Sequence, residues 1–388
     1  MNPAHFSAFI RETLQTNDFI PLHEPVFKGN EMKYLKETID STFVSSVGKF
    51  VNTFEEKLSD FVQVKKGVAT VNGTSALHLS LHALGIDKDC EVITQALSFV
   101  ATANAIAYTG ATPVFVDVDL NTRGLSPQSL SGFLNEFAEI RDDGTFNKKT
   151  GKRIAACVPM HTFGFMTKID EIVAVGKKWN IPIIEDAAEA LGSTYKSQPA
   201  GSFGELSAFS FNGNKIITAG GGGVICTNNV QLADKIKHLS TTAKQPHAWE
   251  FYHDQMGFNY RMPNLNAALG VAQIYRLESF LESKINLSRQ YQHEFSSLDE
   301  CELYIHPNGH TSNYWLQTIV LFENNLDLRN QIIDNAHKNK LFMRPIWRLL
   351  STLPAFGNCP KMDLSTAKSL ANRTINLPSS CYLGMNHE

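Results

Sequence analysis

The sequence predicts an α/β fold, in which a large domain with a mostly parallel central sheet precedes a smaller C-terminal α+β domain. Between Lys66 and Thr241, short runs rich in β-forming residues alternate with runs of helical periodicity. Such alternation is typical of βαβ units, whose helices cover both faces of a parallel sheet. From Asn264 onward a long helical pattern replaces it. We therefore expect a large domain with an N-terminal arm at residues 1–263 and a small domain at residues 264–388.

The expected strands and helices of the large domain follow one another in pairs. Strands are predicted at GVATV (67–71), EVITQ (91–95), TPVFVDV (112–118), RIAACVPM (153–160) and IPIIED (181–186). Helices are predicted at TSALHLSLHAL (74–84), FVATANAIAYT (99–109), PQSLSGFLNEFAEI (127–140) and IDEIVAVGKKW (169–179). The charged run at 141–153 predicts a solvated hairpin or loop. In the small domain we expect one long helix at 264–295, followed by a small α+β unit.

Composition excludes several classes of function. The 388-residue chain has a net charge of −3 and no block of like charges, so nothing favours a nucleic acid or an anionic membrane as partner. We expect no signal peptide, because the N-terminus lacks a basic stretch followed by an apolar one. The most apolar segment, 99–116, contains Asn104, Gly110 and Pro113 and predicts a buried helix and strand rather than a membrane span. Six cysteines without a C-x-x-C pair indicate reduced thiols and a cytoplasmic enzyme.

The stretch Gly73-Thr74-Ser75 opens a predicted helix directly after a strand. Backbone N–H groups at a helix start, together with small hydroxyl side chains, can bind an anion such as phosphate, although an ordinary N-cap has the same pattern. His78 and His82 share one face of this helix at metal-ligand spacing. Because no third ligand accompanies them, we interpret them as packed core histidines and expect no metal.

Asp186 and Lys215 are the two residues most indicative of chemistry. Asp186 ends an apolar strand at the edge where α/β sheets bind ligands; a helix cap, with Glu189 completing a capping box, explains it equally well. Lys215 follows the aromatic run FSF and precedes four glycines, Gly220 to Gly223. A lysine in a partly apolar pocket can act as a nucleophile or Schiff-base amine. The glycines permit a tight turn and close approach of the backbone to a ligand; since G-x-G-x-x-G is absent, a dinucleotide loop is not favoured.

These elements resemble one family over nearly the whole chain. The ordered motifs are NGTSALHL (72–79), SFVATANAI (98–106), GATPVFVDVD (110–119), EDAAEALGS (185–193), SFGELSAFSFNGNK (202–215), GGGGVI (220–225) and GFNYRMPNLNAALG (257–270). Together they resemble the sugar aminotransferases of the DegT/DnrJ/EryC1/StrS group, which use pyridoxal 5′-phosphate (PLP) and have fold type I, that of aspartate aminotransferase. IPLHEPVFKGNE (20–31), STFVSSVGKFV (41–51) and RTINLPSS (373–380) look most similar to the branch that makes 4-amino sugars for bacillosamine and legionaminic acid.

The resemblance implies a role for each matching residue. Lys215 would be the Schiff-base lysine, Asp186 would pair with the pyridinium nitrogen, and Phe99 would stack on the cofactor ring. The phosphate would be held by Gly73, Thr74, Ser75 and Ser210, and by Asn259 from the neighbouring subunit of a homodimer with composite sites. Glu189, near the cofactor, looks like the residue of C4-amino-sugar enzymes. Arg261, Lys49 and His161 are the implied substrate contacts.

The implied reaction moves an amino group from glutamate to an oxo-sugar or sugar nucleotide, most typically a nucleotide-linked 4-keto-6-deoxyhexose. Two positions depart from the family pattern near substrate-facing loops: Phe165 replaces a histidine of a G-H-P-x-D motif, and Ser351 stands where histidine is common. They leave open amination of another oxo-sugar, such as the terminal aldehyde of an 8-oxo ulosonic acid of the Kdo type. A non-catalytic sensor of PLP or a sugar nucleotide is disfavoured, because Lys215 is present.

Overall fold

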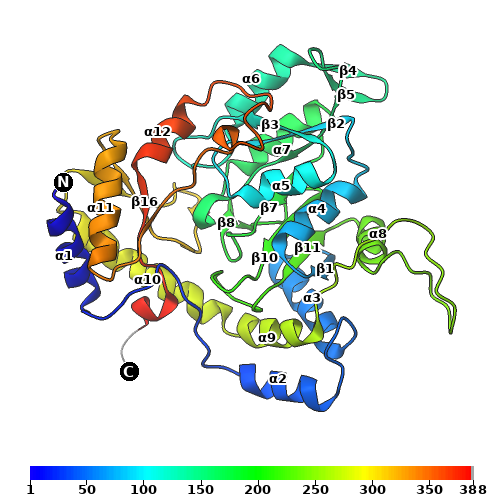
Figure 1. Cartoon of the computed structure of the whole chain (residues 1–388), viewed down its shortest axis with the longest axis horizontal. Helices are drawn as coiled ribbons and strands as arrows, with labels where there is room; N and C mark the ends of the chain where they lie inside the picture. Colours follow the sequence, from blue (N-terminus) through cyan, green and yellow to red (C-terminus); the bar gives the residue numbers. More distant parts are fainter. Residues whose placement is uncertain (386–388) are drawn as a thin grey trace.

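A computed structural model describes residues 1–385 and has a seven-stranded central sheet (Figure 1). Four strands are ordered β1 (Lys66–Thr70), β11 (Gly223–Thr227), β10 (Leu206–Ser210) and β7 (Ile184–Asp186). Three more are ordered β6 (Arg153–Val158), β2 (Cys90–Gln95) and β3 (Thr112–Val116). Parallel bridges from Cys157 to Ile183 and from Met160 to Asp186 join the two groups. Only β11 runs against the others, so the prediction of a mostly parallel sheet is confirmed.

Helices cover both faces of this sheet, as its apolar strands require. One face packs on α4 (Gly73–Ala83), α5 (Val100–Tyr108) and α8 (Val230–Ser240). The other packs on α3 (Lys49–Val62) and α9 (Asn264–Ile274) near β10 and β11, and on α6 (Pro127–Phe137) and α7 (Ile169–Lys178) near β2 and β3. The predicted charged insertion forms a hairpin of β4 (Ala138–Arg141) and β5 (Gly144–Asn147). A helix α2 (Glu31–Asp40) lies outside α9.

The second body of the chain surrounds a four-stranded antiparallel sheet. Its strands are ordered β12 (Cys301–Leu303), β14 (Thr318–Leu321), β16 (Thr374–Asn376) and β15 (Arg344–Pro345), and its helices are α10 (Leu277–Phe295), α11 (Leu326–Lys338) and α12 (Ser365–Arg373). The N-terminal helix α1 (Pro3–Leu14) packs on α11, so the start of the chain lies on this side of the molecule (Figure 1). A third, small sheet consists of three two-residue strands. In it β8 (Thr194–Tyr195) pairs antiparallel with both β9 (Gln198–Pro199) and β13 (His310–Thr311).

The prediction of a single long helix at 264–295 is wrong in one respect, because these residues form two helices, α9 and α10. The break falls at Tyr275, which caps the end of α9, and Arg276, which caps the start of α10. The first helix packs on α3 of the large domain and the second on the small domain. The division of the chain after residue 263 stays a prediction.

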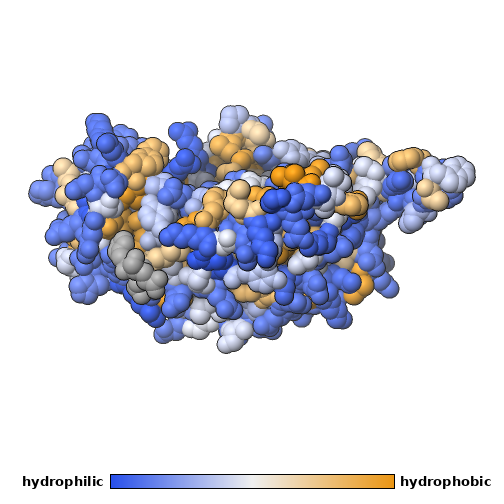
Figure 2. All heavy atoms as spheres, turned by 90° about the horizontal axis from the view of Figure 1, so that it is seen from below, coloured by the Kyte–Doolittle hydropathy of each residue, from blue (hydrophilic) through white to orange (hydrophobic). Residues whose placement is uncertain are grey.

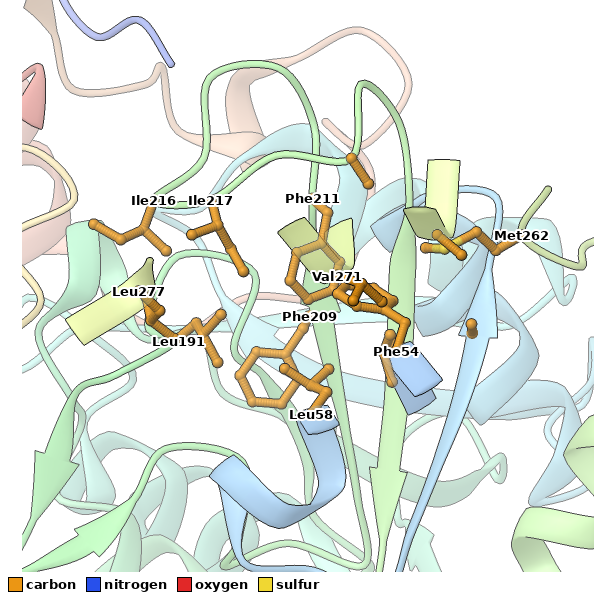
Figure 3. Packing of buried hydrophobic residues seen from close by; sticks show 14 of the residues in the cluster. Phe54, Leu58, Leu191, Phe209, Phe211, Ile216, Ile217, Met262, Val271 and Leu277 are labelled. Carbon is orange, nitrogen blue, oxygen red and sulfur yellow. The ribbon is translucent and has the colours of Figure 1, made fainter. Parts of the chain in front are cut away.

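The loop between β10 and β11 carries Lys215 and is anchored on both sides. Phe211, Ile216 and Ile217 are buried in the core formed with α3 and α9, and Figure 3 shows Ile216 and Ile217 directed toward Leu191 and Leu277. Gly223 has a different role from the one expected of the glycines: a Cβ there would meet the Asn72 carbonyl oxygen at 2.5 Å. That glycine lets β11 pass close to the start of α4, while Gly220 supplies a turn with φ +76°.

Candidate active site

The carboxyl ends of the parallel strands gather the candidate residues at one edge of the sheet. Asp186 is the last residue of β7, and only 3% of its surface is exposed. Its Oδ2 accepts a hydrogen bond from the Thr102 hydroxyl at 2.7 Å, and its Oδ1 accepts one from the Ala188 amide at 3.3 Å. Burial raises the pKa of Asp186, and the Thr102 hydrogen bond opposes this effect. A cation bound beside Asp186 would therefore be stabilised strongly.

Lys215 faces Glu189 and the indole of Trp315. Its Nζ lies 3.3 Å from Glu189 Oε1 and 4.0 Å from the centroid of the Trp315 ring. Glu189 is 3% exposed, and its Oε2 accepts a hydrogen bond from the Phe163 amide at 2.9 Å. Burial raises the pKa of Glu189 to about 7, although the charge of Lys215 lowers it. The amine is thus held at one place, between a carboxyl group and an aromatic face.

The start of α4 forms a cradle suited to an anion. Asn72 caps the helix by accepting a hydrogen bond from the Ser75 amide at 2.7 Å, which leaves the amides of Gly73 and Thr74 outside the cap. Ser210 at the end of β10 lies against this turn, since a Cβ on Gly73 would come within 2.9 Å of Ser210 Cβ. Gly73, Thr74, Ser75 and Ser210 therefore lie together, and the helix N-terminus favours negative charge there.

Phe99 has an uncovered aromatic face beside these groups. It is the residue before α5, one turn ahead of Thr102, and 49% of its surface is exposed. Its ring centroid lies 6.4 Å from that of Trp347. Thr102, one helical turn after Phe99, donates a hydrogen bond to the buried carboxylate of Asp186. The exposed ring of Phe99 therefore provides a place near this carboxylate where a planar cationic ring can stack.

The side chain of His161 is buried in the protein interior and is not exposed in the site. The residue is fully buried; its Nδ1 accepts a hydrogen bond from the Thr167 amide at 3.2 Å, and its Nε2 lies 2.9 Å from Glu185 Oε2. Both ring nitrogens therefore have partners within the protein, and the substrate contact expected for His161 stays a prediction. Its amide donates to the Asp186 carbonyl, so its role here is to position β7.

Three expected residues lie apart from Lys215 in this chain. Lys49, at the start of α3, is exposed and paired with Glu37. Asn259 is exposed and forms a bridge with Thr241, and Arg261 forms one with Thr70 at the end of β1. Among residues 1–385, no hydrogen bond engages the side chain of Asn259 or Arg261. The two remain candidates for contacts with a bound molecule or a second subunit.

Sequence reasoning missed several groups that organise the site. Glu185, next to Asp186, is fully buried and accepts hydrogen bonds from the amides of Gly201, Phe203 and Gly204. Thr102 could have been found as the residue one helical turn after Phe99. Trp315 is contributed by a distant segment, and no local pattern marks it.

The histidines of α4 are packed as expected. His78 is buried against the rings of Tyr108, Phe258 and Tyr260, and its Nδ1 lies 3.3 Å from the Tyr260 hydroxyl. Within residues 1–385, no group of three or more metal-ligating side chains is present. In the same range, no helix combines the length and apolar character needed to cross a bilayer.

The fold and these groups fit PLP. A buried carboxylate without a cation, an uncovered aromatic face, a lysine amine and an anion cradle are the four contacts this cofactor needs, and all lie at one sheet edge. The protein is a PLP-dependent enzyme of fold type I.

The chain belongs to the DegT/DnrJ/EryC1/StrS aminotransferase family, whose model matches residues 25–388. It is a PLP-dependent sugar transaminase. It is 35% identical over 367 residues to a GDP-perosamine synthase of Caulobacter vibrioides, covering 94% of each chain. A GDP-perosamine synthase of Escherichia coli O157:H7 is 35% identical over 363 residues, covering 93% of each. A Streptococcus pneumoniae structure solved in a PLP form is 25% identical, with a TM-score of 0.83 over 93% of this chain and 94% of that one.

Proposed function

We propose that this protein transfers the amino group of glutamate to C4 of a nucleotide-linked 4-keto-6-deoxyhexose, for cell-surface polysaccharide synthesis in the cytoplasm. The observation that carries the proposal is the ion pair of Lys215 with Glu189, 3.3 Å apart, beside the buried Asp186. The relatives support the position of the new amine, because GDP-perosamine is a 4-amino sugar. The motifs at 20–31, 41–51 and 373–380 favour the bacillosamine and legionaminic acid branch within this class.

Each residue of the site has a separate role in the proposed amino transfer. Bound, the cofactor supplies an electron sink for the bond that breaks at the Cα of the amino donor. Lys215 Nζ would hold the cofactor before the donor binds and, as a free amine, would move the proton from that Cα. Asp186 would stabilise positive charge on the ring nitrogen, and Phe99 would lie against one face of the ring. The start of α4 and Ser210 bind the phosphate, and Glu189 orients Nζ.

The two positions that depart from the family pattern, Phe165 and Ser351, are both buried in this chain. Phe165 is 1% exposed and packs on Tyr304, with ring centroids 4.0 Å apart, and on Tyr314. It follows the short helix Thr162–Gly164 after β6, and its expected influence on the choice of sugar stays a prediction. Ser351 is also buried, in a short turn at Leu350–Thr352. Amination of a terminal aldehyde on a Kdo-type ulosonic acid stays the alternative and serves as a comparison in the test.

A homodimer with composite sites belongs to the same proposal. Figure 2 shows apolar residues gathered in patches on the face seen from below, the side where α2 lies in Figure 1. In and after α2, the exposed apolar residues are Met32, Ile39, Phe43, Val44 and Val47. The segment between α8 and α9 projects from the body (Figure 1) and exposes Trp249, Phe251 and Met256. Exposed apolar surfaces of this kind mark contacts with other proteins, and a second copy of the chain would cover them.

A substrate panel tests the proposal. Cofactor-loaded enzyme and glutamate are offered 4-keto-6-deoxyhexoses linked to GDP, UDP or dTDP, a 3-keto isomer, and an 8-oxo ulosonic acid. Aminated products are detected by mass, and the position of the amine by NMR. We expect turnover of a 4-keto sugar nucleotide and at most slow reaction of the 3-keto isomer. Preferred amination of the ulosonic aldehyde would replace the proposed substrate.

A further inference from the structure

The two ring nitrogens of His23 are shielded from water, although the residue as a whole is only half-buried. It lies in the segment of the N-terminal arm that crosses between the two sheets, where the Leu22 carbonyl accepts a hydrogen bond from the Ser379 amide at 2.7 Å. The Glu24 amide on its other side donates to Ser380 Oγ at 3.0 Å. Both ring nitrogens of His23 are buried and unpartnered within residues 1–385. Buried polar groups in folded proteins are nearly always hydrogen-bonded, so a partner is expected.

Lys284 of α10 is a buried cation in the same place. Its side chain is fully buried, and its Nζ donates to the Trp315 carbonyl at 2.8 Å and to the Ser379 carbonyl. Within residues 1–385, no carboxylate lies within ion-pair distance of this ammonium. Burial lowers the pKa of Lys284 to about 7. A buried ammonium satisfied only by carbonyl groups would be stabilised by an anion.

Trp315 and the C-terminal segment connect these groups to the catalytic lysine. The Trp315 ring lies under Lys215 Nζ at 4.0 Å, while its carbonyl accepts from Lys284. Its indole N–H donates to the Asn214 carbonyl at 2.6 Å, next to Lys215. The charges of Lys284 and Lys215 both act on His23 and, together with burial as the main cause, lower its pKa. Burial thus favours a neutral imidazole with one N–H donor. Ser379 links it to Lys284, because the Ser379 amide donates to the carbonyl of Leu22 and the Ser379 carbonyl accepts from Lys284 Nζ.

We propose that His23 and Lys284 form a carboxylate subsite that receives the carboxylate of the amino donor beside Lys215. The imidazole N–H donates to a carboxylate oxygen, and the Lys284 ammonium supplies the compensating charge. The inference rests on the proposed function, because it assigns a contact to the donor half of that reaction.

The chemistry of the subsite favours a carboxylate over the other groups that enter the site. A sugar hydroxyl would satisfy the imidazole but would leave the Lys284 charge without an anion. The cofactor phosphate already has the start of α4 and Ser210. The amino donor must place its Cα at Lys215 Nζ, which lies on the Trp315 ring, so its α-carboxylate enters next to these groups. The diphosphate of a sugar nucleotide is instead separated from its reacting carbon by the sugar ring.

The two half-reactions of the loaded enzyme separate this role from a structural one. Rapid mixing with glutamate follows the donor half by the change in cofactor absorbance, and mixing with the aminated sugar nucleotide follows the other half. His23→Phe keeps the ring volume and removes the hydrogen bond; His293→Phe, at an exposed site on the same helix as Lys284, is the matched control. Glutarate binding, measured by absorbance titration without turnover, is the independent readout.

We expect His23→Phe and Lys284→Met to raise the half-saturating glutamate concentration and the glutarate Kd by about ten- to hundredfold. The half-saturating concentration of the amino sugar should stay within about twofold, and the control should match the wild type. Equal loss in both halves, or unchanged glutarate binding in a folded variant, would overturn the subsite. So would a wild-type enzyme that accepts n-propylamine, an amine without a carboxylate, as readily as glutamate or alanine.

A wild type that reacts with glutamate but aminates no oxo-sugar would instead overturn the proposed function. His23→Asn supplies a second variant if the phenylalanine variant does not fold.

Discussion

Lys215 Nζ and Glu189 Oε1 form an ion pair 3.3 Å long on the face of the Trp315 ring. The three residues come from a loop, from the segment after β7 and from the second body of the chain, so the pair exists only when the whole fold is assembled. The side chain of Lys215 is only 12% exposed, and its neighbours Ile216 and Ile217 are buried in the core (Figure 3). A mobile four-carbon side chain is thereby held at one position before any ligand binds.

Replacing Lys215 by alanine should abolish turnover while the protein stays folded. The change removes the amine that binds the cofactor and moves the proton, which we expect to cost about a thousandfold or more in rate. Borohydride reduction of the loaded wild type should attach the cofactor irreversibly to Lys215. Peptide mapping that finds the adduct on another lysine would contradict the assignment.

Asp186→Asn should leave the shape of the site intact and remove its negative charge. The asparagine can still accept from Thr102, but it no longer stabilises a proton on the cofactor nitrogen. Both half-reactions should slow by at least about a hundredfold, with a smaller effect on cofactor affinity. Single-turnover rates measure this effect, with Thr102→Val as a comparison that keeps the carboxylate. Near-normal rates in Asp186→Asn would refute the role.

The raised pKa of Glu189 makes a prediction about stability. Because its pKa of about 7 in the folded protein exceeds the unfolded value of 4.5, the folded state binds more protons between these values. The stabilisation due to the neutral acid is complete below about pH 4.5 and is lost as the pH rises through 7. Glu189→Gln should therefore gain stability relative to the wild type between pH 5 and pH 8, on the order of 3 kcal/mol. Urea unfolding of the cofactor-free proteins measures the difference, and one that does not grow with pH would contradict the account.

The lowered pKa of Lys284 predicts that the free energy of unfolding depends on pH over a higher range than for Glu189. Its pKa of about 7 in the folded protein lies below the unfolded value of 10.5, so the unfolded state binds more protons between them. The stability of the wild type should rise with pH over this range, by at most about 1.4 kcal/mol per pH unit from this group. Lys284→Met should lack that rise when both proteins are unfolded by urea at pH 7.5 and pH 9.5. Parallel pH dependence of the two proteins would show that the ammonium does not titrate in this range.

Much of the fold could be predicted from the sequence because its signals are local. The strand–helix pairs from β1 to β7 follow from runs such as EVITQ and IPIIED, whose apolar residues need two covered faces. Lys215, Asp186 and Phe99 could be named because they stand in ordered motifs. Trp315, Lys284 and His23 could not, since their importance arises from packing between segments far apart in the sequence. The contact of Phe165 with Tyr304 is likewise visible only in the tertiary structure.

A complementation experiment tests whether two subunits build each site. The Asn259 side chain is exposed, and the Tyr260 carbonyl accepts a hydrogen bond from the Val71 amide at 2.8 Å, so this segment lies beside the strand that leads to the phosphate cradle of its own chain. If Asn259 nevertheless serves the phosphate of a second subunit, Asn259→Ala should weaken cofactor affinity by about ten- to hundredfold, the value of one charge-assisted hydrogen bond.

Mixing Asn259→Ala with Lys215→Ala distinguishes the two arrangements. A heterodimer with composite sites contains one site in which Lys215 and the opposing Asn259 are both intact, so at low cofactor concentration activity should recover toward one wild-type site per dimer. In a site built by one chain, every site carries one of the two defects, and mixing restores nothing. Subunit exchange is verified by mass spectrometry of differently tagged chains. Absence of recovery with exchange complete would show that Asn259 acts within its own subunit.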